Sequence, residues 1–267
     1  MNVVFEGGGI KGLSYIGALR CLEERGLRIN SVAGTSVGAL IAALVAVGYK
    51  SNELEQIIET IDFDAIWPCS TKKGLKKTID FVKKRYVYDI KPLEDTLTKV
   101  LKEKGKTTFG DLKMGNSYRL RIIVTNLKNK DILVVPDDLL LYGINPDTFE
   151  ISKAVCMSSS IPLVYPPYKV NNYSFVDGGL GDNFPIWLYD KNVIGFRVNK
   201  DSKILNLLQK HVFKNTYNHQ HENLVYINTT DFKATDFTKG INARKMLYNR
   251  GYYHTKIFLD NYFLSGL

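Results

Sequence analysis

The sequence predicts an α/β fold with a mostly parallel sheet. Two short apolar stretches, residues 2–5 and 32–33, each run through a glycine-containing turn into a helical pattern. Strands that alternate with helices in this way form parallel sheets whose faces the helices cover. A chain of 267 residues is long enough to bury such a core in one α/β domain.

The composition is that of an ordinary globular protein. A hydrophobic fraction of 45% and a charged fraction of 24% are typical of soluble chains. The cysteines, Cys21, Cys69 and Cys156, are odd in number and lack C-x-x-C spacing, which excludes a complete internal disulfide framework and a cysteine-based zinc site. They suit a reducing compartment. Because the sequence shows no signal peptide, lipidation motif or membrane span, we expect a cytoplasmic protein.

Positive charge is concentrated in one stretch. The net charge is +9, and residues 72–106 alone contribute +7. Within them Leu75, Ile79 and Val82 recur at helical spacing among lysines, which predicts an amphipathic basic helix. Its basic face is either solvated or in peripheral contact with anionic membranes. The lysines that would make this contact are Lys72, Lys73, Lys76 and Lys77. No motif supports a nucleic-acid partner.

A glycine loop follows the first predicted strand. It reads Gly7-Gly8-Gly9-Ile10-Lys11-Gly12 and leads into a helix predicted over residues 13–25, so its backbone N–H groups can bind an anion at a helix N-terminus. The loop matches G-x-G-x-x-G, but the acidic residue that a dinucleotide site needs about 20 positions later is missing. It is not a P-loop, because Lys11 precedes Gly12 and the loop has no Gly-Lys pair followed by Ser or Thr.

A serine motif, Gly34-Thr35-Ser36-Val37-Gly38, follows the second predicted strand. It reads G-x-S-x-G, and the helix that leaves it, residues 39–47, ends at Gly48. Between a strand and a helix this motif indicates a nucleophile elbow, whose strained backbone lifts the serine hydroxyl clear of the sheet. Chance occurrence at a small-residue helix entry is the alternative. A membrane span is disfavoured, because the apolar part covers only residues 37–47 and a span requires roughly 20.

The glycine loop and the serine motif suit one acyl-transfer site, in which one supplies N–H donors and the other a nucleophile. If their two strands are parallel neighbours, both turns lie at the same carboxyl edge of the sheet. Acyl transfer forms a tetrahedral oxyanion that needs preformed N–H donors, each worth roughly 2.7–4 kcal/mol. We therefore expect the loop to supply donors beside a nucleophilic Ser36.

The remaining elements follow from local patterns. Arg119–Thr125 and residues 132–135 are rich in β-branched and apolar residues and are predicted to pair as a hairpin. Further strands are predicted over residues 173–176, 192–198 and 223–227, and further helices over 51–60 with Ser51 as N-cap, from Pro92 to about 104, over 151–157 and over 242–263.

An aspartate ends one of these strands. Asp177-Gly178-Gly179 follows residues 173–176, so the carboxylate is held at a strand end, where sites of α/β sheets lie. An ordinary Asp-Gly turn gives the same local pattern. The functional interpretation therefore depends on the other motifs.

The glycine loop at residues 7–12, the serine motif at residues 34–38 and the Asp177-Gly178-Gly179 motif follow one another in this order. Together they resemble the patatin-like phospholipase family. Three lesser segments agree with the family pattern: Ser158-Ser159-Ser160-Ile161-Pro162, Thr108-Phe109-Gly110-Asp111-Leu112 and Asp182-Asn183-Phe184-Pro185. The resemblance covers about residues 3–198, and Lys11 stands where the family often has arginine. We expect one domain over residues 1–267, with residues 199–267 as its C-terminal part.

The resemblance implies a three-layer α/β/α sandwich with a Ser–Asp dyad and no catalytic histidine. Ser36 would be the nucleophile, Asp177 the base, and the amides of Gly8 and Gly9 much of the oxyanion hole. The implied substrate is a phospholipid or another acyl lipid, cleaved as by a phospholipase A or lysophospholipase. We expect no metal or organic cofactor. Head-group preference and oligomeric state do not follow from the sequence.

Two other interpretations stay open at this point. One is an α/β-hydrolase esterase with a Ser–Asp–His triad, since the order Ser36, Asp177, histidine is allowed. Its histidine would be His211, His219, His221 or His254. The other is a module without catalysis that binds a nucleotide or a lipid through the glycine loop.

Overall fold

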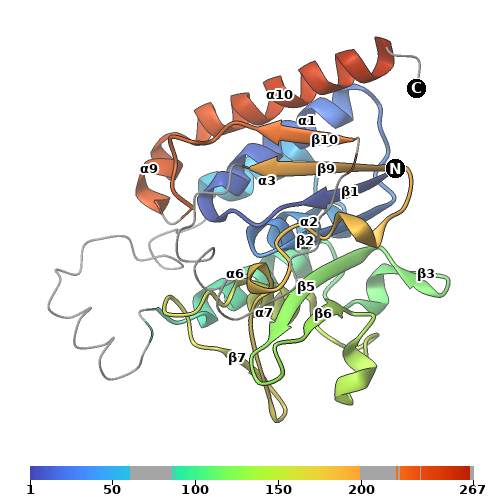
Figure 1. Ribbon diagram of the computed structural model, residues 1–267, viewed down its shortest axis with the longest axis vertical. Helices are drawn as coiled ribbons and strands as arrows, with labels where there is room; N and C mark the ends of the chain where they lie inside the picture. The colour runs from blue at the N-terminus through green and yellow to red at the C-terminus, as the bar shows by residue number, and fades with distance from the viewer. Residues whose placement is uncertain (61–85, 87, 199–220, 222, 235, 265–267) are drawn as a thin grey trace, which may run out of the picture.

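A computed structural model of the chain describes residues 1–60, 86, 88–198, 221, 223–234 and 236–264. The predicted basic helix, with Lys72, Lys73, Lys76 and Lys77, lies outside the described residues. The described helices and strands (Figure 1) are, in order, β1 (Asn2–Phe5), α1 (Ser14–Glu24), β2 (Ser31–Thr35), α2 (Val37–Val47), α3 (Ser51–Thr60), α6 (Lys91–Glu103), β3 (Lys113–Met114), β4 (Ser117–Tyr118), β5 (Leu120–Asn126), β6 (Ile132–Val135), α7 (Ile151–Ser159), β7 (Tyr168–Val170), β8 (Tyr173–Asp177), β9 (Val193–Val198), β10 (Leu224–Ile227), α9 (Phe237–Asn242) and α10 (Arg244–Leu264). Short 3-10 helices add η1 (Gly9–Leu13), η2 (Gly110–Leu112), η3 (Leu139–Tyr142), η4 (Gly178–Leu180) and η5 (Ile186–Leu188).

The predicted α/β fold with a mostly parallel sheet is confirmed. The main sheet has the order β10-β9-β1-β2-β5-β8-β7, with β6 also paired to β5. Its four pairs from β10 to β5 are parallel, and the pairs that involve β6, β7 and β8 are antiparallel. The predicted β5–β6 hairpin forms, with Ile122 opposite Val135.

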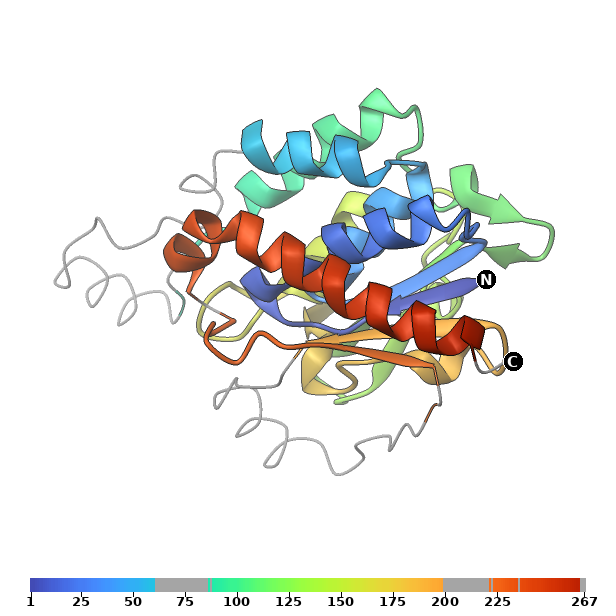
Figure 2. The same ribbon diagram turned by 90° about the horizontal axis from the view of Figure 1, so that it is seen from above.

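The sheet lies between two layers. Side chains of β1 alternate in direction, so Val3 and Phe5 belong to the large core while Val4 belongs to a smaller cluster with Phe184 and Ile186. The main helices gather on the large-core side, as Figure 2 shows from above. On the other face, the segment that contains η5 covers Val4 and Ala33. The sheet is therefore buried on both faces at β1 and β2, as expected of parallel strands.

The strand β5 aligns the ends of β2 and β8. Strands β2 and β6 both pair with Ile122 and Ile123, so they lie on opposite sides of β5. Strands β6 and β8 both pair with Val124 and Thr125, so β8 lies on the same side as β2. The two strands therefore meet end to end along one edge of β5. The last residue of β2, Thr35, pairs with Ile123, and the last residue of β8, Asp177, pairs with the next residue, Val124.

The C-terminal helix packs along the first helix. In Figure 1 α10 runs beside α1, and the glycines at the contact, Gly17 and Gly251, allow the close approach. A Cβ at Gly251 would overlap the Ser14 carbonyl, and a Cβ at Gly17 would overlap that of Tyr248. The C-terminal part thus shares the core of the N-terminal part. That residues 1–267 form one domain stays a prediction.

Two local details complete the fold. The predicted N-cap role of Ser51 is wrong: Ser51 is the first helical residue of α3, and its hydroxyl donates to Glu23 Oε2 at 2.6 Å. The Ser51 hydroxyl is therefore bound to a carboxylate of α1 and does not cap its own helix.

The apolar helix α2 has 11 residues and ends at Gly48, whose φ is 108°. Across the described ranges no helix is both long and apolar enough to cross a membrane.

Candidate active site

Ser36 occupies a tight turn between β2 and α2. Its φ of 56° and ψ of −123° are unusual for a residue with a side chain. The flanking glycines make room for this turn. A Cβ at Gly34 would lie 2.8 Å from the Ala39 nitrogen, and a Cβ at Gly38 would lie 2.9 Å from the Glu6 carbonyl oxygen and closer to that of Phe5. The geometry is that of the strand–turn–helix elbow expected from G-x-S-x-G.

The glycine loop lies directly beside this turn. Strands β1 and β2 are parallel neighbours with Phe5 opposite Gly34, so the loop and the turn leave the same edge of the sheet. A Cβ at Gly12 would collide with the side chain of Val37, the first residue of α2. The sequence-based expectation that both motifs share one edge of the sheet agrees with this register.

The glycine loop is clamped at both ends. At its start the Gly7 N–H donates to the Asn183 carbonyl at 3.0 Å, and Asn183 Nδ2 donates to the Gly7 carbonyl at 3.0 Å. At its end the Ile10 N–H donates to the Ala234 carbonyl at 3.0 Å. Between the clamps, the amides of Gly8 and Gly9 donate no hydrogen bond to the described part of the chain. Two adjacent N–H groups are thus available to an anion.

Asp177 is buried at the junction of β8 and β2. Its Oδ1 accepts the Gly179 N–H at 2.7 Å, whereas Oδ2 has no hydrogen bond of ordinary geometry within the described residues. Burial raises the pKa of Asp177 from 3.8 to about 6, while the nearby Ser36 side chain and the Gly179 amide act in the opposite direction. The strand register brings the two residues together, because Thr35, the residue before Ser36, pairs with Ile123 and Asp177 pairs with the next residue of β5, Val124. Asp177 is thus a weakly solvated carboxylate facing a serine.

The end of helix α7 contacts both residues, a role that motif analysis did not identify. The Ser158 hydroxyl accepts the Ser36 N–H at 2.8 Å and donates to the Ile123 carbonyl at 2.6 Å. The Ser160 carbonyl accepts the Asp177 N–H at 3.0 Å. The sequence signal was the small-residue segment that precedes Pro162. This segment resembles the family pattern, but the resemblance does not show which groups it contacts.

An ion pair between the buried Glu6 and the half-buried Arg197 lies at the base of the glycine loop. Arg197 Nη2 lies 3.0 Å from Glu6 Oε1, and the Val198 N–H donates to Glu6 Oε2 at 2.9 Å. The Tyr15 hydroxyl donates to the Glu6 carbonyl at 2.7 Å. Glu6 is fully buried, and burial of an unpaired carboxylate would destabilise the fold. The contacts of the Glu6 carboxylate with Arg197 and the Val198 amide offset this cost.

Several candidate residues are not brought to this site. His221 and His254 are the described histidines, and neither forms a hydrogen bond with Ser36 or Asp177 in the part of the chain that the structure covers. His254 lies on α10, where burial lowers its pKa. His211 and His219, like Lys72, Lys73, Lys76 and Lys77, fall outside the described residues.

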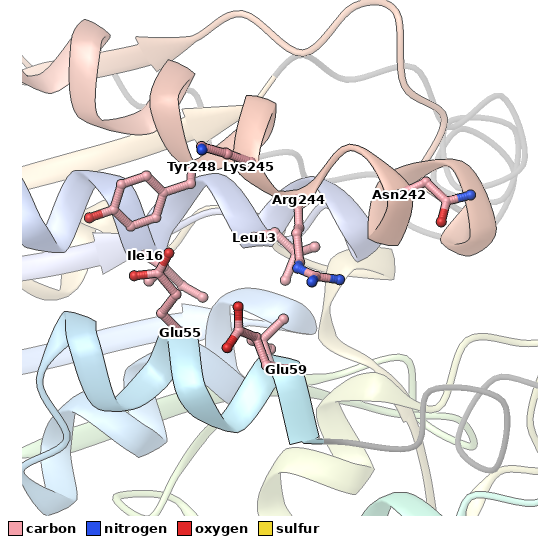
Figure 3. Close-up of a pocket in the computed structure, with 9 residues that line it drawn as sticks. Leu13, Ile16, Glu55, Glu59, Asn242, Arg244, Lys245 and Tyr248 are labelled. Carbon is pink, nitrogen blue, oxygen red and sulfur yellow. The ribbon is translucent and has the colours of Figure 1, made fainter.

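A separate cavity of about 440 Å³ lies between α1, α3 and α10 (Figure 3). Neither Ser36 nor Asp177 lines it. Glu55 and Glu59 of α3 point toward α10, from which Arg244 points toward Glu59, and Leu13 and Ile16 of α1 lie between the two helices. The lining residues are Leu13, Ile16, Glu55, Ile58, Glu59, Asn242, Arg244, Lys245 and Tyr248. We take Ser36 and Asp177 as the candidate active site because the serine turn, the glycine loop and the buried carboxylate lie together in the sheet, apart from this cavity.

Comparison with known proteins identifies the family of this chain. The family model described as patatin-like phospholipase matches residues 3–189. This chain belongs to the patatin-like phospholipase family. The family match spans the glycine loop, the serine motif, α7 and Asp177, and it ends before β9, β10 and α10.

Individual relatives extend the comparison. The uncharacterized protein YqhO of Bacillus subtilis is 34% identical, and the match covers 97% of this chain and 98% of YqhO. The probable lipid hydrolase 463L of Invertebrate iridescent virus 6 is 26% identical over 69% of this chain and 61% of its own length. Among solved structures, VipD of Legionella pneumophila has a TM-score of 0.65 at 19% identity, with 97% of this chain and 66% of VipD covered. At that identity the likeness shows the shared patatin-like fold alone.

Proposed function

We propose that this member of the patatin-like family is a lipid acyl hydrolase of the phospholipase A or lysophospholipase type. The single observation that carries the proposal is the position of Ser36 and the buried carboxylate of Asp177 at the adjoining ends of β2 and β8, beside two amides without partners in the described residues. Nucleophile, base and anion donors are the three groups that acyl transfer requires. The chain's relative 463L is named as a lipid hydrolase, which supports a lipid ester as substrate.

In the proposed first half-reaction, Ser36 Oγ attacks the ester carbonyl carbon and its proton passes to Asp177. The carbonyl oxygen becomes an oxyanion, which accepts hydrogen bonds from the backbone N–H groups of Gly8 and Gly9. Collapse of this intermediate breaks the acyl–oxygen bond, and the proton on Asp177 passes to the departing alcohol. The acyl group stays on Ser36 as an ester.

In the second half-reaction, Asp177 takes a proton from water, and the resulting hydroxide attacks the acyl-Ser36 carbonyl. The proton then returns to Ser36 Oγ as the fatty acid leaves. A carboxylate with the usual pKa near 3.9 is a weak base at neutral pH. Burial that raises the pKa of Asp177 to about 6 strengthens this base while leaving it ionised at pH 7. The proposed cycle requires no metal or organic cofactor.

We further propose that the enzyme meets its substrate at a membrane surface. The motivation is the net charge of +7 over residues 72–106, which suits anionic lipid. Lys72, Lys73, Lys76 and Lys77 are the proposed contacts.

The decisive experiment is labelling with a serine-reactive fluorophosphonate, followed by peptide mapping. We expect one phosphonylated residue, Ser36, and loss of both labelling and hydrolysis of a short-chain ester in Ser36→Ala. Ser174→Ala is a matched control on β8, because the Ser174 hydroxyl makes no hydrogen bond within the described ranges. A folded wild type that is neither labelled nor active on any acyl ester would overturn the proposal and favour a binding module.

A further inference from the structure

Residues 228–234 connect β10 to α9, and we call this segment the strap. We propose that the strap positions the glycine loop, and that Arg250 holds the strap through Asp231. The inference rests on the proposed hydrolase function. It gives the C-terminal part a role in catalysis, although this part lies beyond the family match at residues 3–189. Arg250 and Asp231 would be positioning residues, since they act through the backbone of the strap.

The contact between strap and loop is made by one carbonyl. Ala234 O accepts the Ile10 N–H at 3.0 Å, and a Cβ added to Gly9 would overlap the same carbonyl. Gly9 has a φ of 56°, a conformation natural to glycine. The carbonyl thus binds the Ile10 amide and limits where Gly9 can lie. With Asn183 holding Gly7 at the other end, the amides of Gly8 and Gly9 have little freedom to turn away from a developing oxyanion.

The buried ring of Phe232 and the ion pair between Arg250 and Asp231 hold the strap in place. The ring of Phe232 is fully buried, with Arg250 Cζ 5.7 Å and Lys239 Nζ 5.1 Å from its centroid. The Arg250 guanidinium bonds both Asp231 carboxylate oxygens, the Nη2–Oδ2 contact being 3.0 Å, and donates to the Asn228 carbonyl at 3.2 Å. Lys239 Nζ donates to the Asp231 carbonyl at 2.7 Å. Such a planar, two-pronged contact fixes orientation better than a point charge does.

The arrangement makes oxyanion stabilisation depend on α10. Helix α10 packs against α1, and Arg250 projects from it to the strap, which reaches the loop through Ala234. Donors in an oxyanion hole act only when they are aimed before the reaction, and a displacement of about 1 Å costs up to 10²-fold in rate. Neither Arg250 nor Asp231 touches Ser36 or Asp177 by any contact among the described residues. Loosening the strap should therefore lower turnover without altering the base.

The test uses the full chain and three variants, Arg250→Gln, Asp231→Asn and Arg250→Lys. Lys256→Gln is the matched control, because it removes a 2.7 Å ion pair with Asp260 from the same helix, away from the strap. We expect kcat for a soluble ester to fall about 10- to 100-fold in the first two variants. KM should change less than about twofold, as should all parameters of the control. Arg250→Lys, which keeps the charge, should retain more activity than Arg250→Gln.

Two further readouts separate positioning from general damage. Hydrogen exchange of the Ile10 amide should accelerate in Arg250→Gln while exchange in α2 stays as in wild type. The pH at half-maximal activity should stay at the wild-type value, since Asp177 is untouched. If Arg250→Gln does not fold, Asp231→Asn carries the same measurements with its shape conserved.

Two results would overturn the inference. In one, folded Arg250→Gln or Asp231→Asn keeps kcat within about twofold of wild type. In the other, the loss in kcat comes with unchanged Ile10 exchange or a shifted pH profile. A wild type that is neither labelled at Ser36 nor active is a different outcome, visible before any variant is made, and it removes the hydrolase proposal together with this one.

Discussion

The backbone N–H of Ser36 donates to the hydroxyl of Ser158 at 2.8 Å, and that hydroxyl donates in turn to the Ile123 carbonyl at 2.6 Å. One buried side chain of α7 therefore joins the serine turn to the strand β5. Since β5 also carries Val124, the register partner of Asp177, the same contact sets the spacing between the serine and the carboxylate.

Replacing Ser158 by alanine should reduce both stability and activity. The change leaves a buried N–H and a buried C=O without a partner, so we expect a loss of about 2–4 kcal/mol in unfolding free energy. Turnover should fall about 10-fold or more because the turn loses its anchor. Urea unfolding and ester hydrolysis measure the two effects, with Ser174→Ala as the control. A Ser158→Ala protein as stable and active as this control would contradict the anchoring role.

The activity should depend on the ionisation of Asp177. Because the carboxylate is the active form of the base and its pKa is raised to about 6, kcat/KM should increase with pH and level off above an inflection near 6. A soluble short-chain ester, assayed between about pH 4.5 and 8, avoids changes in membrane binding. An inflection near 4 would mean that Asp177 is solvated during catalysis.

Replacing Asp177 by asparagine should stabilise the fold at neutral pH. The rise in pKa from 3.8 to about 6 means that the folded state disfavours the charged carboxylate by about 3 kcal/mol. The folded state retains the proton to higher pH than the unfolded state, so wild-type stability decreases as pH rises from 3.8 to 6 and the full cost persists above 6. Asp177→Asn should thus unfold at higher urea at pH 7, and this advantage should fade below pH 4. A variant less stable than wild type at pH 7 would refute this account.

Histidine replacement separates the dyad from a triad. We expect His211→Gln, His219→Gln, His221→Gln and His254→Gln each to keep most of the ester hydrolysis. Asp177→Asn should lose about 10²–10⁴-fold in rate because it cannot accept the proton. The double variant Ser36→Ala/Asp177→Asn should be little worse than either single variant, because the two residues act as a unit. A folded single histidine variant as inactive as Ser36→Ala would establish the triad instead.

The proposed membrane contact is tested by charge removal. Replacing Lys72, Lys73, Lys76 and Lys77 by Gln should weaken binding to anionic vesicles, since each lysine near such a surface contributes about 1 kcal/mol. Hydrolysis of a soluble ester should be unchanged, and raised salt should reduce the difference by screening. Co-sedimentation with anionic and zwitterionic vesicles measures the effect. Equal vesicle binding by both proteins at low salt would refute the contact.

Most elements were predictable because their signals are local. The bounds of β1 and β6 agree with the prediction residue for residue, and Gly48 ends α2 as predicted. Apolar spacing and glycine position decide such elements within a few residues of chain. The N-cap role of Ser51 failed for the opposite reason, since Glu23 from another helix binds its hydroxyl.

The sequence by itself determined the backbone demands of the site. Glycine is required at positions 9, 34 and 38 because other backbone atoms approach too closely for a Cβ, and this requirement is visible as a motif. The tertiary structure alone decided which distant groups complete the site. Burial of Asp177 depends on β5 and α7, the Ser36 amide depends on Ser158, and the end of the glycine loop depends on Ala234. Hydrogen bonds and desolvation depend on distances in space. Residues far apart in the sequence come within these distances only once the sheet has assembled.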